Sequence, residues 1–175
     1  MSIIRIEDIA HVRFRAPDLG AMRSFLEDFG LVIAEASDAR LVARGAGTSP
    51  VCHITEAGEA GFAAIGFRAE TVADLERLAA AEGAPVQDFD APGGGKVVVL
   101  TDPDGHRVEV VAGQTPAAAL PLPAPQPFNK ASGHERLRAV KRIAPGPASV
   151  LRLGHAVLNV SDFRRSEAWY KDQIG

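Results

Sequence analysis

The chain has 175 residues, of which 46% are hydrophobic and 23% charged, with a formal net charge of −3 at pH 7. This length allows one well-buried core with sequence left for a linker or a partial second domain. A single cysteine, Cys52, excludes an intrachain disulfide framework and a Cys-rich zinc module. No secretory signal sequence follows Met1, and no apolar run approaches the roughly 20 residues that span a bilayer. We therefore expect a cytoplasmic protein with no membrane partner.

Charge is unevenly distributed along the chain. Residues 1–112 carry 18 acidic and 10 basic side chains, whereas residues 113–175 carry 4 acidic and 9 basic ones. The basic residues of the second part follow ordinary apolar patterning without interleaved aromatic residues, which disfavours a nucleic-acid partner. We expect the basic part to pack on the acidic part of the same chain or of a second copy.

The first 57 residues predict a strand, a helix and three further strands. Residues 9–17 alternate as a strand does, and Asp18 is a preferred helix N-cap residue. Helical spacing of apolar residues follows and ends at Gly30, a typical C-terminal cap. Short strands are predicted at residues 31–36, 39–44 and 50–55, between turn-forming residues.

The same order of elements then recurs. A strand is predicted at residues 62–69, a helix at 71–82, and strands at 85–89, 96–100 and 107–111. The tripeptide Phe-Arg-Ala at residue 14 reappears 53 positions later, and His53 and Glu56 are matched at the same distance by His106 and Glu109. A duplicated unit is therefore predicted, with copies at about residues 1–57 and 58–112.

A linker and the start of a third copy follow. Residues 113–149 are rich in Pro and Ala and predict an extended linker, with a short basic helix at residues 134–142. Aligning His155 with His11 places Asp162 on Asp18, which predicts a strand at residues 151–160 and a helix after it. One strand and one helix cannot cover their own apolar faces. Residues 150–175 are therefore interpreted as the start of a truncated third module that packs on another surface.

Three of these motifs resemble the vicinal-oxygen-chelate superfamily of glyoxalases, bleomycin resistance proteins and extradiol dioxygenases. Residues 9–14 with Asp18 resemble the opening strand of its βαβββ module, and residues 102–105 (Asp-Pro-Asp-Gly) with Glu109 resemble its closing hairpin. Residues 153–158 with the Trp169-Tyr170 pair resemble the opening of the C-terminal, catalytic half of a four-module extradiol dioxygenase. The resemblance implies an α+β fold in which paired βαβββ modules form a curved mixed sheet around a cleft.

The resemblance also implies candidate metal ligands. Extradiol enzymes hold Fe(II) or Mn(II) with two His and one carboxylate from first and last strands of paired modules, leaving open positions for catechol and dioxygen. His155 would be one ligand in the complete protein, with its companions outside this chain. In the first pair the matching residues are His11 and Glu109, with Glu56 as a weaker third candidate through the repeat. Ala64 stands where a second His is expected, so we expect no tightly bound transition metal there.

Each candidate ligand also has a structural interpretation. His11 would be a half-buried strand histidine with a backbone partner, and Glu109 a solvated or hydrogen-bonded carboxylate. His155 would be a structural histidine. The remaining three histidines are expected on the surface: His53, His106 and His134.

Three functions remain open. The first is the N-terminal portion of an extradiol (catechol ring-cleaving) dioxygenase-like oxidoreductase of aromatic catabolism, in which this domain is itself non-catalytic. Its substrate would be a small catechol-like aromatic, and it would form a homodimer or higher homo-oligomer. The second is a glyoxalase-like isomerase or lyase with its site at His11 and Glu109. The third is a metal-free small-molecule-binding protein of the bleomycin-resistance type.

Overall fold

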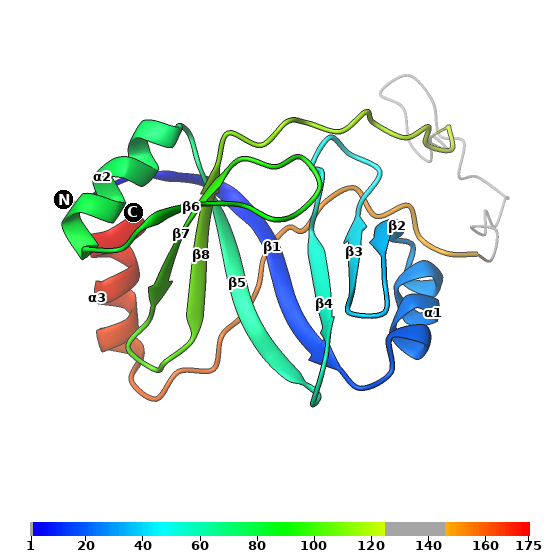
Figure 1. The fold of residues 1–175 in the computed structure, drawn as a ribbon, viewed down its shortest axis with the longest axis horizontal. Helices are drawn as coiled ribbons and strands as arrows, with labels where there is room; N and C mark the ends of the chain where they lie inside the picture. Colours follow the sequence, from blue (N-terminus) through cyan, green and yellow to red (C-terminus); the bar gives the residue numbers. More distant parts are fainter. Residues whose placement is uncertain (1, 125–145) are drawn as a thin grey trace, which may run out of the picture.

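The computed structural model describes residues 2–124 and 146–175. These residues form one mixed sheet of eight strands, in the order β2-β3-β4-β1-β5-β8-β7-β6, with three helices (Figure 1). The expected α+β fold of two βαβββ units is confirmed, whereas the basic helix predicted at residues 134–142 lies outside the described residues. The elements are β1 (Ile6–Ala16), α1 (Leu19–Phe29), β2 (Val32–Ala36), β3 (Arg40–Arg44), β4 (His53–Ala57), β5 (Gly61–Ala69), α2 (Val72–Glu82), β6 (Val86–Asp88), β7 (Lys96–Thr101), β8 (Arg107–Ala112) and α3 (Phe163–Ile174).

The three helices begin at side-chain caps that the sequence contains. Asp18 caps α1 by accepting a hydrogen bond from the backbone N–H of Ala21 at 2.9 Å, and Asp162 does the same for α3. Thr71 and Asp74 form a reciprocal capping box at the start of α2. Gly30 ends α1 in the left-handed conformation, with a φ of 101°. Local sequence is therefore sufficient to set these helix boundaries.

The two βαβββ units join through their opening strands. Within each unit the opening strand pairs in parallel with the closing strand, β1 with β4 and β5 with β8. Between the units β1 pairs antiparallel with β5, and Val12 lies opposite Ile65, 53 positions later in the chain. The pseudo-two-fold axis therefore passes between these two residues, and Ala64 is the counterpart of His11, as the repeat predicts.

The repeat shifts by two positions at the closing strands. Val12 pairs with His53 in the first unit, whereas Ile65 pairs with Val108 in the second. The counterpart of Glu109 is therefore Ile54, and the prediction that matched Glu56 with Glu109 is wrong. Hydrogen-bond register defines equivalence in a sheet, and the connections leading to β4 and β8 differ in length.

Side-chain alternation gives the sheet two different faces. Ile65, Val98 and Val108 pack under α2 and α3, and Ala43 and Cys52 pack with Leu26 of α1. The opposite face, called the inner face here, carries a core of its own. Its buried members are Ala10, Val42, Val51, Ile54, Phe89, Val97 and Val111. His11, Arg13 and Glu109 follow the alternation of this inner face.

The strand predicted at residues 151–160 is not formed. This segment is extended and runs from the α1 side of the molecule to the α3 side (Figure 1). At its beginning, the backbone N–H of Ala46 donates to the carbonyl of Val150 at 2.7 Å, and the N–H of Gly47 donates to the carbonyl of Leu151 at 3.1 Å. An opening strand pairs with the closing strand of its own module, as β1 does with β4, and no such strand lies beside it in the described part of the chain.

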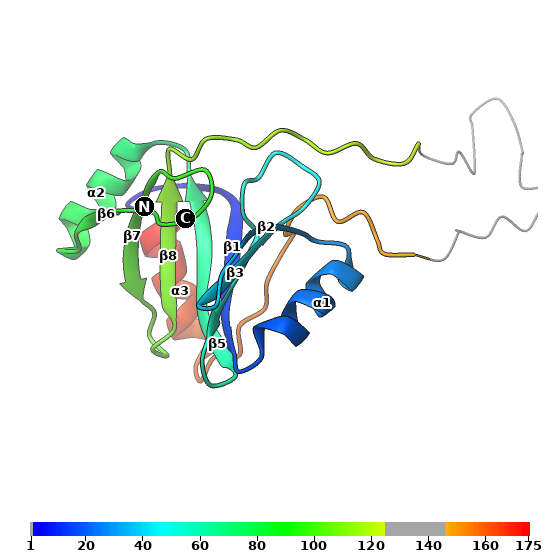
Figure 2. The ribbon, with the colours of Figure 1, turned by 45° about the vertical axis from the view of Figure 1, so that its right-hand side comes forward.

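Helix α3 packs on the second βαβββ unit. Ile174 is 2% exposed within the core beneath α2, and Trp169 and Tyr170 pack against the same core. The N–H groups of Ile3 and Ile4 bond to carbonyls at the end of α3, which brings the two ends of the chain together (Figures 1 and 2). Arg152 pairs with Asp8 at 2.8 Å and Arg165 with Asp104 at 3.1 Å. The basic segment thus packs on the acidic part of its own chain, one of the two expected arrangements.

No helix within residues 2–124 or 146–175 combines the length and hydropathy needed to cross a bilayer.

Truncating Ile174 tests the packing of α3. Replacing a fully buried Ile by Ala removes methylene groups from a filled site, so Ile174→Ala should lower the free energy of unfolding by about 2–4 kcal/mol. Urea denaturation followed by the fluorescence of Trp169 measures this value. Val157→Ala, a similar truncation at a side chain that is 82% exposed, is the matched control. Equal stability of the two variants would show that α3 is not docked.

Candidate functional site

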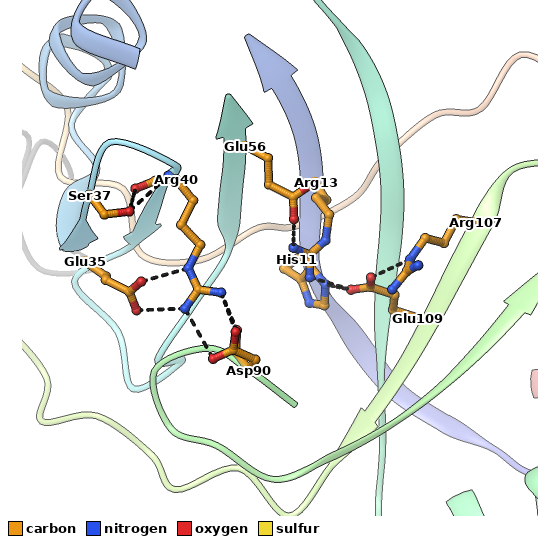
Figure 3. A network of polar contacts seen from close by, with 9 residues as sticks. All are labelled: His11, Arg13, Glu35, Ser37, Arg40, Glu56, Asp90, Arg107 and Glu109. Carbon is orange, nitrogen blue, oxygen red and sulfur yellow. Dashed lines mark hydrogen bonds and ion pairs between the residues drawn. The ribbon is translucent and has the colours of Figure 1, made fainter. Parts of the chain in front are cut away.

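Polar side chains from three strands meet on the inner face at the centre of the sheet (Figure 3). His11 Nε2 donates to Glu109 Oε2 at 2.7 Å, and Arg13 Nη2 donates to the same oxygen at 3.2 Å. The other carboxylate oxygen of Glu109 accepts from Arg107 Nε at 2.8 Å. Arg13 also reaches Glu56 Oε1 through Nη1 at 2.6 Å. One guanidinium therefore bridges two carboxylates.

Gly66 makes room for the imidazole of His11. A Cβ atom at Gly66 would overlap Cε1 and Nδ1 of the ring, so His11 can lie across β5 only because this position has no side chain. On another side the ring of Phe89 lies 5.2 Å from that of His11, centroid to centroid. His11 is fully buried with a carboxylate partner, which differs from the half-buried histidine with a backbone partner considered above.

Glu109 is a buried carboxylate that stays ionised. Burial by itself raises the pKa of Glu109, but the hydrogen bond from His11 and the charge of Arg13 outweigh it, and the pKa falls from 4.5 to about 2. The side chain is 1% exposed, so its charge must be balanced locally. Its function in this arrangement is to hold His11, Arg13 and Arg107 in place.

The residues of this cluster do not fit a divalent metal ion. Arg13 lies within ion-pair distance of both Glu56 and Glu109, so a cation already occupies the space between the two carboxylates. The symmetric position that would supply a second imidazole is Ala64. In the described part of the chain no group of three or more His, Cys, Asp or Glu side chains is arranged to hold a metal. His11 Nδ1 and Arg13 Nε are buried without a hydrogen-bond partner among the described residues.

The other histidines lie elsewhere. His155 is exposed on the extended segment. His53 is half-buried rather than on the surface, stacked on Phe14, and burial lowers its pKa to about 4. His106 is also half-buried, and its Nδ1 lies 3.0 Å from the buried carboxylate of Asp102. His134 lies outside the described residues.

A second network ties the two units together at another point of the inner face (Figure 3). Arg40 of β3 donates to both carboxylate oxygens of Glu35, at 2.7 and 3.1 Å, and pairs with Asp90 at 3.0 Å. Asp90 follows Phe89 in the loop after β6. The ion pair therefore secures the loop that places Phe89 against His11.

A cleft of about 480 Å³ lies beside the buried cluster. Its polar lining comes from the end of β1, with Arg13 and Arg15, from Glu56 of β4, and from His106 and Arg107 where β8 begins. Phe62 provides an apolar wall, in edge-to-face contact with the ring of His106 at 5.8 Å. The cleft is thus rich in cationic donors.

The arginines of the site were not predicted from the sequence. The residues His11, Arg13 and Arg15 alternate along β1, so a basic row on one face of the strand was present in the pattern. The carboxylates that pair with Arg13 lie on β4 and β8, more than 40 positions away in the sequence, so the pattern along β1 does not identify them.

The glyoxalase/bleomycin resistance protein/dioxygenase superfamily model matches residues 8–110. The chain belongs to this superfamily. The match covers both βαβββ units and ends within β8. None of the curated proteins matches the sequence.

Solved structures with the superfamily fold include two dioxygenases and a glyoxalase. Homoprotocatechuate 2,3-dioxygenase from Brevibacterium fuscum, in complex with 3,4-dihydroxyphenylacetate, has a TM-score of 0.65 at 19% identity, covering 88% of this chain and 46% of that one. The 2,3-dioxygenase LapB from Pseudomonas sp. KL28 has a TM-score of 0.59 at 24% sequence identity, and the match covers 67% of this chain and 44% of that one. The Mn(II)-bound glyoxalase from Novosphingobium aromaticivorans has a TM-score of 0.62 at 22% sequence identity, and the match covers 69% of this chain and 43% of that one. The chain therefore spans less than half the length of these superfamily members.

Replacing Gly66 tests whether the imidazole needs the space above β5. Gly66→Ala should displace His11 from Glu109 and lower the free energy of unfolding by about 1–3 kcal/mol, the usual cost of overpacking a filled core. Chemical denaturation measures the loss. Gly61→Ala in the same strand is the control, because its Cβ would meet no atom closer than Arg15 Nη2 at 4.0 Å. Similar losses in both variants would contradict the packing argument.

The depressed pKa of Glu109 predicts how stability depends on pH. Because the pKa is about 2 in the folded chain and 4.5 ordinarily, the ionised carboxylate stabilises the fold fully above about pH 5.5. This contribution, about 3 kcal/mol, is lost as the pH falls through 4.5 towards 2. The stability difference between the chain and Glu109→Gln should therefore shrink in that window. Glu59→Gln, at an exposed position, is the control, and the same pH profile there would refute the assignment.

Proposed function

We propose that this chain is the N-terminal portion of an extradiol-dioxygenase-like protein, and that its βαβββ pair is a non-catalytic domain. The observation that carries this proposal is the guanidinium of Arg13, which joins Glu56 and Glu109 where superfamily members can hold a metal. A metal-dependent reaction then needs ligands from another pair of modules. Residues 150–175, which follow this pair, resemble the opening of one.

Two features support a dioxygenase-like arrangement. The likeness to the Brevibacterium fuscum enzyme extends over 88% of the chain, more than residues 8–110 account for. Asp162 caps α3 as Asp18 caps α1, as expected of an equivalent opening helix. We propose that His155 is a ligand of Fe(II) or Mn(II) in the complete protein, with catechol-like aromatics as its substrate class and a homo-oligomer as its assembly.

The two alternatives make different demands on the pair. A glyoxalase-like isomerase or lyase at His11 and Glu109 would need further ligands, and Arg13 and Ala64 stand in their places. A metal-free binding protein needs a ligand cleft, and residues 1–112 contain one beside Arg13. The second alternative is therefore compatible with the same domain.

Activity of the protein encoded with its downstream sequence tests the proposal. With Fe(II) or Mn(II) supplied, this longer protein should cleave catechols, whereas the 175-residue chain should not. His155→Ala should lower kcat/KM by more than about 100-fold, because loss of a ligand exceeds the effect of losing a supporting contact. His11→Ala should retain activity, since His11 is placed in the non-catalytic pair.

Metal analysis of the purified 175-residue chain provides the second arm. We expect less than stoichiometric iron, manganese or zinc, because the cluster around Arg13 is already neutralised. One tightly bound equivalent that disappears in His11→Ala would reverse the assignment of this pair. A coding sequence without a further His-bearing opening strand and closing Glu would remove the dioxygenase proposal.

A further inference from the structure

Two arginines that line the cleft beside Arg13 have hydrogen-bond donors without a partner among the described residues. Among the described residues Arg107 has only Glu109 as a partner, through Nε, and its side chain is 52% exposed, so its two terminal nitrogens have no partner there. Arg15 is exposed and makes no hydrogen bond or ion pair with any described residue. Nδ1 of His106 donates to Asp102, so Nε2 of the neutral imidazole can only accept a hydrogen bond and is not one of these donors. A ligand in this cleft would meet arginine donors from both β1 and β8.

Arg15 is the cation of the cleft that has no carboxylate partner among the described residues. The cleft is lined by Arg13, Arg15 and Arg107 and by one carboxylate, Glu56. Arg13 pairs with Glu56 and with the buried Glu109, and Arg107 pairs with Glu109. A monoanion would give Arg15 a partner, whereas a neutral ligand would not.

Side chains that line the cleft are held in position before any ligand arrives. Asp102 is buried and accepts from the backbone N–H groups of Asp104 and His106 and from the His106 ring. Glu109 holds Arg107 by accepting a hydrogen bond from its Nε. The aliphatic part of Arg15 lies along the β4–β5 hairpin, where a Cβ on Gly58 would be 3.5 Å from its Cδ. Preorganised donors reduce the entropy lost on binding.

Part of the cleft wall is apolar. Phe62 lines it together with Ala63, and the ring of Phe62 is fixed by edge-to-face contacts with Phe14 and His106. A volume of about 480 Å³ falls within the range of small-molecule sites. Arginine forks bind carboxylates with two parallel hydrogen bonds, and an aromatic wall favours a planar apolar body.

From these features we propose that the cleft binds a small organic monocarboxylate with a planar apolar body. The carboxylate pairs with Arg15 and the free nitrogens of Arg107, and the body lies against Phe62. This function needs neither a metal nor a downstream module. Its failure would therefore leave the dioxygenase proposal intact, and the reverse also holds.

Calorimetric titration of the 175-residue chain with benzoate tests the proposal. Benzoate should bind with one site per chain, and benzyl alcohol, which keeps the ring and lacks the charge, should bind at least about tenfold more weakly. Acetate keeps the charge and lacks the ring, and it should also bind more weakly than benzoate. Absence of benzoate binding would overturn the proposal, as would equal binding of acetate or tighter binding of inorganic phosphate.

Two matched variants assign the site. Arg15→Met should raise the Kd of benzoate about tenfold, because a charge-assisted bidentate contact is lost. Its circular dichroism should be unchanged, since the side chain is exposed. Arg77→Met on α2, where Arg77 is 58% exposed, changes the net charge equally and should leave the Kd unchanged. Equal weakening by both variants would mean that net charge attracts benzoate, and the cleft assignment would be wrong.

Discussion

The antiparallel pairing of β1 with β5 joins the two βαβββ units, and most features of the inner face depend on its register. With Val12 opposite Ile65, His11 lies over Gly66 and Arg13 lies opposite Ala64. Alternation then places His11, Arg13 and Glu109 together on the inner face and Val12 on the face covered by the helices. A slip of one residue would exchange these faces and bury the charges of β1 under the helices. The register is therefore specified by the hydrophobic pattern of both strands.

Burial of Glu109 imposes the next requirement. A carboxylate that is 1% exposed must be paired and hydrogen-bonded, and His11, Arg13 and Arg107 provide three donors. The same arrangement has a functional consequence, because Arg13, which pairs with Glu109, also pairs with Glu56. A domain stabilised in this way holds its central charges internally and directs its remaining cationic donors into the neighbouring cleft. Superfamily membership describes the fold of this pair, and Arg13 and Ala64 determine the composition of its central cluster.

The turn before β8 connects the cleft to the C-terminal helix. Asp102 accepts hydrogen bonds from His106 on one side and from the Tyr170 hydroxyl at 3.1 Å on the other. Asp104 accepts from Ser166 at 3.2 Å and pairs with Arg165. Burial and the charge of Asp102 raise the pKa of Tyr170, so the phenol remains a donor at neutral pH. One four-residue turn thus orients a wall of the cleft and fixes the position of α3.

The sequence by itself determined the elements whose information is local. Asp18, Thr71 and Asp162 cap the helices because a cap needs only residues within one turn. Apolar periodicity and the 53-residue repeat predicted the two βαβββ units and the position of Ala64, and the family followed from the same motifs. The sequence also identified His11 and Glu109 as a related pair, without showing that Arg13 pairs with the same carboxylate.

Only the tertiary structure decided the features that depend on distant pairing. The two-residue shift between β4 and β8 made Ile54, not Glu56, the counterpart of Glu109, because register follows loop lengths as well as residue identity. Residues 151–160 carry a strand pattern but form no strand, because a strand exists only where a neighbouring strand bonds to it. The position of Arg13 between two carboxylates likewise arises from three strands that meet in space. Long-range geometry therefore decided the chemistry of the site, whereas local sequence decided its scaffold.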